Sequence, residues 1–451
     1  MSKITRRDFI KQAGLASAGL MLGGVALSNK SYARVKGAND RVNVGVVGFS
    51  DRFRATLLPC FLNHKDKLNF DIVGVSDIWK LRREEGGRYL EGKLGHSMRQ
   101  YVNNEALYKD KDIDAVIIST ADFQHAVHAI EAAEAGRDMY VEKPFAETME
   151  DNRAARKAVE KAGVIFQMGS QRRSGPNYHA ANDFIRSGKF GDIVMCEMTW
   201  NVNQPDRWRR PTLVPKCKKE DLDWTRYLCN RPYQDFDPRK YLEYRLFWPF
   251  SSGIPGQWMA HQIDTVHWFT GLHHPRSVTA NGNIYLWKDG RTNYDTMTAV
   301  MDYGPTDDPN KGFQVLYSSR FTNSAGGVKE IYYSNGGELN LDTNMISSNG
   351  YLTKAHAEKM GLKENKLPEI KLEGIKAASE ANMGGDPLTS LHMQNWMECV
   401  RSRKQPNAPV GAAYDHSTAC IMVNAALRTK QYVEFDEEHQ EVIAGGKIFK
   451  Y

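Results

Sequence analysis

Short apolar runs alternate with longer helical stretches between residues 41 and 166. Five of these runs have the length and composition of buried strands, and they cover residues 42–47, 70–75, 115–118, 138–141 and 164–168. The segments between them have helical periodicity, most clearly at 125–135 and 149–162. Strands that alternate with helices predict an α/β fold with a Rossmann-like, doubly wound parallel sheet.

The pattern changes after residue 171. Turn-rich segments now separate strand-like runs, which cover residues 193–200, 277–286, 296–302, 312–318 and 330–333. These runs predict a C-terminal α+β domain with a large, mostly antiparallel open-faced sheet. Residues 344–385 are polar and poorly periodic, so we expect loops there. Helices are expected near 391–402 and 412–429, and both are candidates for packing back on the first domain.

The first 33 residues form a separate segment. Residues 5–11 read TRRDFIK, a twin-arginine pattern, and an apolar stretch of small residues follows at 13–27. Ser31-Tyr32-Ala33 resembles a cleavage site. We therefore expect a periplasmic or otherwise exported protein whose mature chain begins near Arg34. The alternative is an amphipathic N-terminal helix. Later runs are too short to span a membrane, so we expect no stable span after leader removal.

Charge and cysteine content narrow the class of protein. The net charge is +6, but the leader holds five bases and one acid, which leaves 55 basic and 53 acidic side chains. A nearly balanced mature chain predicts no nucleic-acid partner. The six cysteines show no CxxC pair and no metal-ligand spacing, so we expect no metal site and mostly free, buried thiols.

A glycine turn follows the first predicted strand, in the sequence GVVGFSDRF at 45–53. Gly48 stands at the tight turn of a dinucleotide-binding fingerprint, while Ser50 and Phe53 occupy the second and third glycine positions. The Ser50 amide and hydroxyl still suit a phosphate. A plain strand–turn–helix is the alternative.

Asp77 lies 29 residues beyond Gly48, at the end of the next predicted strand. A carboxylate there accepts hydrogen bonds from ribose hydroxyls and repels a 2′-phosphate, which favours NAD over NADP. Lys80, Arg82 and Arg83 would weaken that preference. A helix N-cap is an equally compatible role for Asp77.

Three blocks carry a family resemblance: STADFQH at 119–125, Glu142-Lys143-Pro144, and FQMGSQRR at 166–173. Their order and spacing resemble the Gfo/Idh/MocA oxidoreductase family, and further matches at 222–224, 261–264, 288–291 and 395–403 extend the resemblance over nearly the whole mature chain. It implies a dinucleotide-binding domain at 38–168 and a substrate-binding and oligomerisation domain at 169–451. An open-faced sheet favours a homo-oligomer, either a dimer or a tetramer.

The resemblance also implies site residues. The cofactor would contact Gly48, Phe49, Ser50, Asp77, Thr120, Phe123, His125, Glu142 and Lys143. Lys143 would in addition be catalytic, because an amine in a partly desolvated cleft can bind the reacting oxygen and ease its deprotonation. The alternative for Lys143 is a surface salt bridge with Glu142. Ala121 stands where family members commonly have proline.

A second catalytic candidate is His261. If residues 257–268 are helical, Gln257, His261 and Asp264 lie on one face, and a histidine there suits a general base. A core histidine is the alternative. Gln257 stands where sugar-dehydrogenase relatives often have Asp, and an amide orients an imidazole without stabilising its charged form as well. Arg172, Gln257 and Asp264 are tentative substrate contacts.

Aromatic and guanidinium groups cluster between residues 200 and 211, at Trp200, Arg207, Trp208, Arg209 and Arg210. Such groups stack on sugar faces and bind hydroxyls, and they equally suit a domain or subunit interface.

Export constrains the reaction, since nicotinamide cofactors are kept in the cytoplasm. We therefore expect an NAD-dependent oxidoreductase that acts on a sugar or glycoside with a tightly retained cofactor. One alternative is an NAD-dependent glycoside hydrolase or lyase that oxidises C3 transiently. Another is a non-catalytic sugar-binding relative, because Ser50, Phe53 and Gln257 all depart from the family pattern.

Overall fold

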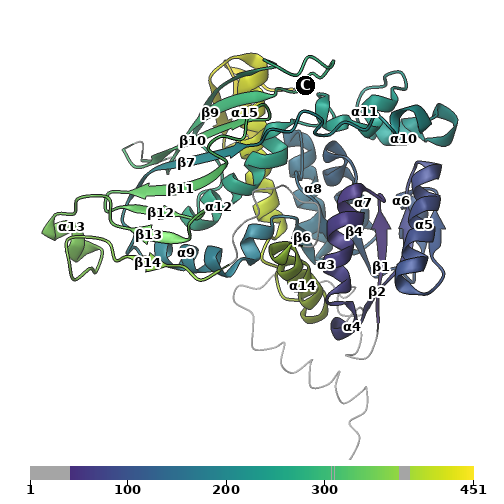
Figure 1. Ribbon diagram of the computed structural model, residues 1–451, viewed down its shortest axis with the longest axis horizontal. Coiled ribbons are helices and arrows are strands. Elements are labelled where there is room, and N and C mark those ends of the chain that lie inside the picture. Colours follow the sequence, from purple (N-terminus) through teal and green to yellow (C-terminus); the bar gives the residue numbers. More distant parts are fainter. Residues whose placement is uncertain (1–40, 306, 309, 375–385, 451) are drawn as a thin grey trace, which may run out of the picture. The chain divides into compact units, whose positions relative to one another are not determined.

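The computed structural model describes residues 41–450 apart from 306, 309 and 375–385 (Figure 1). The predicted leader, residues 1–33, lies outside the described residues. Among the described helices, none combines the length and hydropathy that a membrane crossing requires.

The first domain contains a six-stranded parallel sheet in the order β3-β2-β1-β4-β5-β6. Its strands are β1 (Val42–Val47), β2 (Phe70–Ser76), β3 (Arg99–Tyr101), β4 (Ala115–Ile118), β5 (Asp138–Val141) and β6 (Phe166–Met168). Helices cover both faces, so the strands other than β3 are almost entirely buried and appear as continuous apolar runs. The Rossmann-like prediction is confirmed. The edge strand β3 was missed because its sequence, RQY, contains no apolar run.

Helices pack on both faces of this sheet and bury two separate apolar clusters. They are α3 (Leu58–Leu62), α4 (Lys65–Leu68), α5 (Lys80–Leu94), α6 (Asn104–Lys109), α7 (His125–Glu134) and α8 (Met149–Ala162). The bounds of α8 could be predicted from the residues at its two ends. The Thr148 side chain accepts a hydrogen bond from the Asp151 amide at its start, and Gly163, with φ +62°, ends it.

The second domain contains an eleven-stranded sheet in the order β14-β13-β12-β11-β7-β10-β9-β8-β15-β16-β17. Its longer strands are β7 (Ile193–Asn201), β8 (Ser277–Asn283), β9 (Thr296–Tyr303), β10 (Phe313–Arg320) and β11 (Val328–Ser334). Pairing is antiparallel except between β7 and β10, which are parallel. The mostly antiparallel sheet predicted for this domain is confirmed.

The short elements of this domain were not predicted. Residues 344–385, expected as loops, contain β13 (Met345–Ser347), α13 (Lys354–Lys359) and β14 (Ile370–Lys371) within their described part. Four further short strands escaped prediction: β12 (Glu338–Asn340), β15 (Val433–Asp436), β16 (Glu441–Ala444) and β17 (Lys447–Ile448). Strands of two to four residues offer too few alternating positions to produce a recognisable period.

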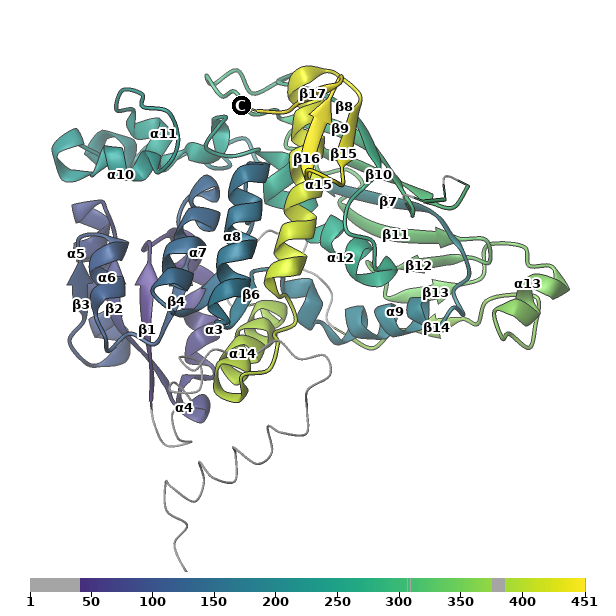
Figure 2. The ribbon, with the colours of Figure 1, turned by 180° about the vertical axis from the view of Figure 1, so that it is seen from behind.

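Two C-terminal helices join the domains (Figure 2). α14 (Pro387–Ser402) packs on the first sheet, where His392 Nε2 lies 2.6 Å from the Met168 carbonyl oxygen. α15 (Val410–Thr429) contacts both α8 and β8. The Asn152 side-chain amide donates to the Tyr414 carbonyl at 3.0 Å. Helices α9 (Pro176–Arg186) and α12 (Ala260–Thr270) complete the second domain's main helical packing. All six cysteines are free and five are buried, as predicted.

Candidate active site

A cavity of about 600 Å³ lies at the carboxyl ends of the parallel strands, where open α/β sheets bind ligands. The first domain lines it with residues 47–52 and 76–79, parts of segment 119–128, Glu142 and Lys143. The second domain forms the opposite wall with residues 204–208, parts of 210–245 and Gln257. Eight of the nine predicted cofactor residues line this cavity. Phe123 does not, because its ring packs between those of Tyr227 and Phe250, with both centroid distances 5.3 Å.

The turn after β1 requires glycine at only one position. Gly48 has φ +85°, and a Cβ there would lie 2.8 Å from Thr120 Cγ2. The Ser50 hydroxyl accepts from the Phe53 amide at 3.1 Å, which caps the following helix. The helix begins at Asp51, and Phe53, which is fully buried in the core, starts a π-turn at Phe53–Leu57 within it. The wider turn accommodates the ring where the fingerprint would place a glycine.

Asp77 is fixed at the cavity by two backbone amides. Its Oδ2 accepts from the Phe49 amide at 3.0 Å and its Oδ1 from the Trp79 amide at 2.9 Å. Burial raises the pKa of this carboxyl. Each oxygen retains a second lone pair for a ribose hydroxyl. α5 begins after Trp79, whose own side chain makes no cap, so Asp77 lies just outside the helix.

Two of the three cations that follow Asp77, Arg82 and Arg83, are already engaged, and the third, Lys80, is exposed at the start of α5. Arg82 pairs with Asp51 at 3.0 Å and with Glu85 at 3.1 Å, and Arg83 donates to the Asp77 carbonyl at 2.9 Å. A guanidinium group that is already hydrogen-bonded to the protein binds a 2′-phosphate less strongly. Together with the Gly48 cradle and the cavity volume, the Asp77 carboxylate fits NAD.

Lys143 reaches across the cavity to the second domain. Its Nζ donates to the Gln257 carbonyl at 2.5 Å. Glu142 is instead paired with Arg52, at 2.9 Å, so it is not the salt-bridge partner considered as the alternative for Lys143. Burial lowers the pKa of the half-buried Lys143 amine to about 7, although the carboxylates of Asp122 and Glu142 oppose the shift. The amine is therefore partly neutral near pH 7.

The side-chain amide of Gln257 belongs to a hydrogen-bonded network. Its Oε1 accepts from Arg245 Nε at 2.9 Å, and its Nε2 donates to Asp122 Oδ2 at 2.5 Å. The Ser251 hydroxyl donates to the same Asp122 oxygen at 2.6 Å. Gln257 therefore orients toward Asp122 and Arg245 rather than toward His261. Arg245 could not be identified from the sequence, because it lies in the short 3-10 turn Tyr244–Leu246 and outside every motif.

Residues 42–170 match the model of the GFO_IDH_MocA family, described as an oxidoreductase family with an NAD-binding Rossmann fold. The first domain is therefore similar to the NAD-binding domain of these oxidoreductases. Scyllo-inositol 2-dehydrogenase (NAD(+)) of Bacillus subtilis is 42% identical over 123 residues, which cover 27% of this chain and 34% of that protein. A glycosyl hydrolase family 109 protein of Shewanella baltica is 27% identical over 239 residues, covering 46% and 50% respectively. The chain thus spans about a third to a half of the length of these curated relatives.

Solved structures share the fold of the whole described chain. Levoglucosan dehydrogenase in complex with NADH and levoglucosan has a TM-score of 0.62 at 15% identity, covering 88% of this chain and 99% of that one. The WlbA dehydrogenase of Bordetella pertussis, in complex with NADH and UDP-GlcNAcA, has a TM-score of 0.62 at 16% identity with the same coverage. These similarities show that the two-domain fold is shared with known dehydrogenases.

His261 does not line the cavity. Its ring stacks on Trp200 with centroids 5.7 Å apart, and its Nε2 has no hydrogen-bond partner among the described residues. Burial and the nearby charges of Lys143 and Arg172 hold its pKa well below the usual range, so the imidazole is neutral. The helix was expected to have one α-helical register. A π-turn at Pro255–Met259 precedes α12 and rotates Gln257 relative to His261.

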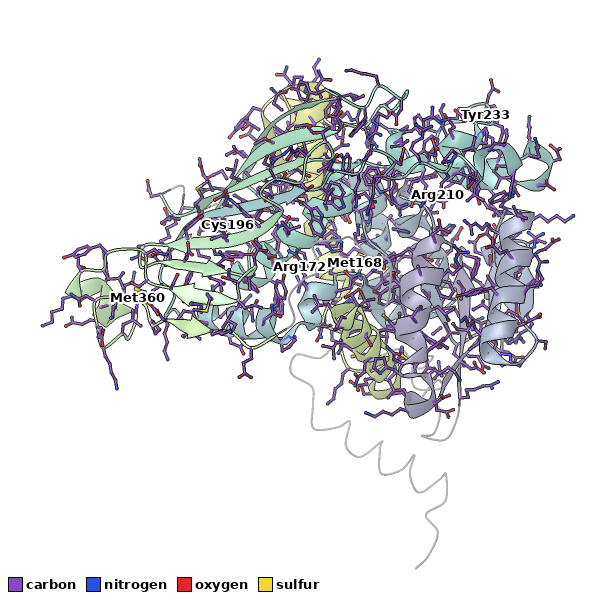
Figure 3. All side chains as sticks on the ribbon, in the orientation of Figure 1. Met168, Arg172, Cys196, Arg210, Tyr233 and Met360 are labelled. Atoms are coloured by element: carbon purple, nitrogen blue, oxygen red, sulfur yellow. The ribbon has the colours of Figure 1, made fainter. Side chains whose placement is uncertain are left out.

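The two remaining predicted substrate contacts, Arg172 and Asp264, lie in buried ion pairs outside the cavity lining. Arg172 (Figure 3) pairs with Glu330 of β11. Asp264 pairs with Arg173 at 2.8 Å, and this contact helps to hold its pKa well below the usual range. Both pairs join the 3-10 turn Gln171–Ser174 to the second domain. The sequence could not show the Glu330 partner, which is 158 positions away from Arg172.

Proposed function

We propose that this protein is an NAD-dependent oxidoreductase that acts on a CH–OH group of a sugar or glycoside. The observation that supports it most directly is Lys143, an amine with a pKa of about 7 at the cavity of an NAD-binding domain. Several similar proteins are named for sugar or inositol substrates. A polar cavity wall of arginine and glutamine side chains suits a ligand rich in hydroxyl groups.

Bound NAD would supply the hydride acceptor. Lys143 would take the proton of the reacting hydroxyl group, because one of its N–H groups is held by the Gln257 carbonyl and the neutral amine has a free lone pair. A base with a pKa near the working pH is most effective in this role. The network of Gln257, Asp122 and Arg245 would fix the backbone carbonyl that positions Lys143. For His261, a role as a second base stays a prediction.

We further propose that the protein is exported by the twin-arginine route with its cofactor already bound, and that it forms a dimer or tetramer. The leader motif supports export, and this route carries folded proteins. An enzyme outside the cytoplasm cannot exchange NADH with a cytoplasmic pool. Its net reaction must therefore return the hydride to a substrate within the same cycle or to a second substrate.

Single-turnover measurements on the purified full chain test the redox proposal. Dinucleotide released by denaturation is quantified first, and the reduced-nicotinamide absorbance is then followed after addition of sugars, inositols and anhydrosugars. We expect at least one of these polyols to reduce the bound cofactor, and Lys143→Met to slow that reduction by about 10²- to 10⁴-fold. Bound dinucleotide that no polyol reduces, together with aglycone release from a nitrophenyl glycoside without net NADH, would favour the glycosidase alternative. A chain that neither carries nor binds dinucleotide would be a non-catalytic relative.

A further inference from the structure

An irregular segment of the second domain covers the dinucleotide side of the cavity. It runs from residue 204 to 245 and contains α10 (Trp224–Leu228) and α11 (Pro238–Leu242), and we call it the cover segment. In both ribbon views α10 and α11 lie beyond the ends of α5, α6 and α7 (Figures 1 and 2). Its residues contribute most of the second domain's wall of the cavity. The glycine turn and the strand end at Asp77 therefore face protein rather than bulk water.

The cover segment contacts the first domain next to Asp77, the predicted ribose site. Leu222 forms an antiparallel bridge with Trp79, two residues beyond Asp77, and the Asp223 amide donates to the Ile78 carbonyl at 3.4 Å. The Trp79 ring packs edge-on against Tyr241, with centroids 5.9 Å apart. These contacts fix the cover directly above the predicted ribose site.

A second set of contacts between the cover segment and the first domain lies around α7 and α8. The buried Gln124 side chain donates to the Tyr227 carbonyl at 2.8 Å. Asp151, at the start of α8, accepts from Arg231 at 3.0 Å and from the Asn230 amide at 2.6 Å. The Arg231 and Asp151 side chains are 1% and 6% exposed, so this ion pair is shielded from screening by salt. Buried charges of this kind are costly to separate.

Four arginines of the cover segment line the cavity wall: Arg207, Arg210, Arg226 and Arg245. Arg226 pairs with Glu105 of the first domain and with Asp223. Arg210, which Figure 3 labels on the cover segment, has its Nε 3.2 Å from Asp51 Oδ2, and this places its guanidinium at the glycine turn. Arg245 lies at the opposite, catalytic end, bound to Gln257. Arg207 packs over the Trp258 ring at 5.9 Å and is influenced by both neighbouring charges. Burial and these two cations lower the Arg207 pKa to about 10, and an anion between them would relieve the repulsion.

We propose that the cover segment locks the dinucleotide in place, with Arg207 and Arg210 binding its diphosphate from the second domain. The inference rests on the proposed function, since it assumes an NAD-dependent enzyme, and it assigns the retention of the cofactor to named residues. Ser50 and Phe53 remove two glycines from the turn that ordinarily approaches the pyrophosphate. Arg210 pairs with Asp51 and Arg207 donates to Gln204, but a guanidinium group has five N–H donors, so both side chains would add charge-assisted contacts to the same anion from the opposite wall.

The test measures how fast bound NAD exchanges with isotopically labelled NAD, by mass spectrometry of the full chain. We expect Arg207→Gln/Arg210→Gln to accelerate exchange by at least about tenfold, the effect of losing one charged hydrogen bond. Arg207→Lys/Arg210→Lys should recover part of the loss. Lys216→Gln is the matched control, because Lys216 is exposed on the same segment and does not line the cavity. Asp151→Asn should also speed exchange, because it breaks the ion pair with Arg231 and leaves Arg207 and Arg210 unchanged.

Each outcome separates this inference from the proposed function. Equal exchange rates in wild type and the double Gln variant, with thermal unfolding unchanged, would overturn the diphosphate assignment and leave the oxidoreductase proposal standing. Unchanged retention with a raised KM for substrates that carry a carboxylate would assign the arginines to the substrate and overturn the inference. A wild-type chain that binds no NAD would defeat the proposed function itself.

Discussion

At the scale of single residues, burial makes protonation of the Lys143 amine unfavourable. We expect Lys143→Met to lower kcat by about 10²- to 10⁴-fold, the usual contribution of a positioned base. The same variant should unfold at higher temperature. The folded-state pKa of about 7 lies below the ordinary 10.5, so protonation favours the unfolded chain. The gain in stability should be largest below pH 7, decline as the pH rises, and vanish above about 10.5.

Thermal unfolding at several pH values and the pH profile of kcat check this prediction. Lys157→Met serves as the control, because Lys157 is exposed on α8. A variant that retained the wild-type rise in rate around pH 7 would show that another group titrates in the wild-type profile.

Asp122 tunes Lys143 without a direct ion pair. Its carboxylate raises the Lys143 pKa, opposing the effect of burial. Asp122→Asn should therefore move the rising limb of the kcat profile to lower pH, since the amine loses its proton more easily. Glu150→Gln removes an exposed carboxylate nearby and should leave the profile in place. A shift to higher pH in Asp122→Asn would contradict this electrostatic assignment.

At the scale of elements, the turn after β1 is sensitive to one methyl group. Gly48→Ala should destabilise the fold by at least about 1–2 kcal/mol, the cost of the left-handed conformation, and weaken NAD binding. The added Cβ would also press on Thr120. Gly92→Ala is the matched control, because Gly92 lies inside α5 with open space around it. That change should stabilise the fold by about 0.5–1 kcal/mol. Urea unfolding measures both, and equal effects would contradict the argument.

The elements also show what the sequence could and could not reveal. Strands β1 and β4 are buried on both faces, so their apolar runs identify them, and Thr148 and Gly163 mark the ends of α8. Local signals of this kind also located most of the cavity floor. The π-turn before His261 could not be predicted, because its register depends on tertiary packing. Pairings such as Arg172 with Glu330 join distant segments, and a single sequence carries no signal for them.

At the scale of the whole molecule, the last helices couple the two domains. Arg403, just after α14, pairs with Asp138 of β5 at 2.5 Å, and α15 contacts α8 of the first domain and β8 of the second. The cover segment adds contacts on the far side of the cavity. A ligand enclosed by both domains stabilises them together, because it binds only the folded state. If the cofactor is bound before export, the protein would therefore be transported folded, with the cofactor holding its two domains together.

This reasoning predicts where the cofactor is found in cells that express the full chain with its leader. The exported protein should carry close to one dinucleotide per chain, and added NAD should not increase its activity. Changing Arg6 and Arg7 to lysine should retain the protein in the cytoplasm with the same dinucleotide content, because the leader acts on transport and the cover segment on retention. Cell fractionation and quantification of the released dinucleotide check both expectations. An exported pool without dinucleotide, beside a loaded cytoplasmic pool, would mean that the cover opens during export, and the redox-neutral cycle would then have no cofactor.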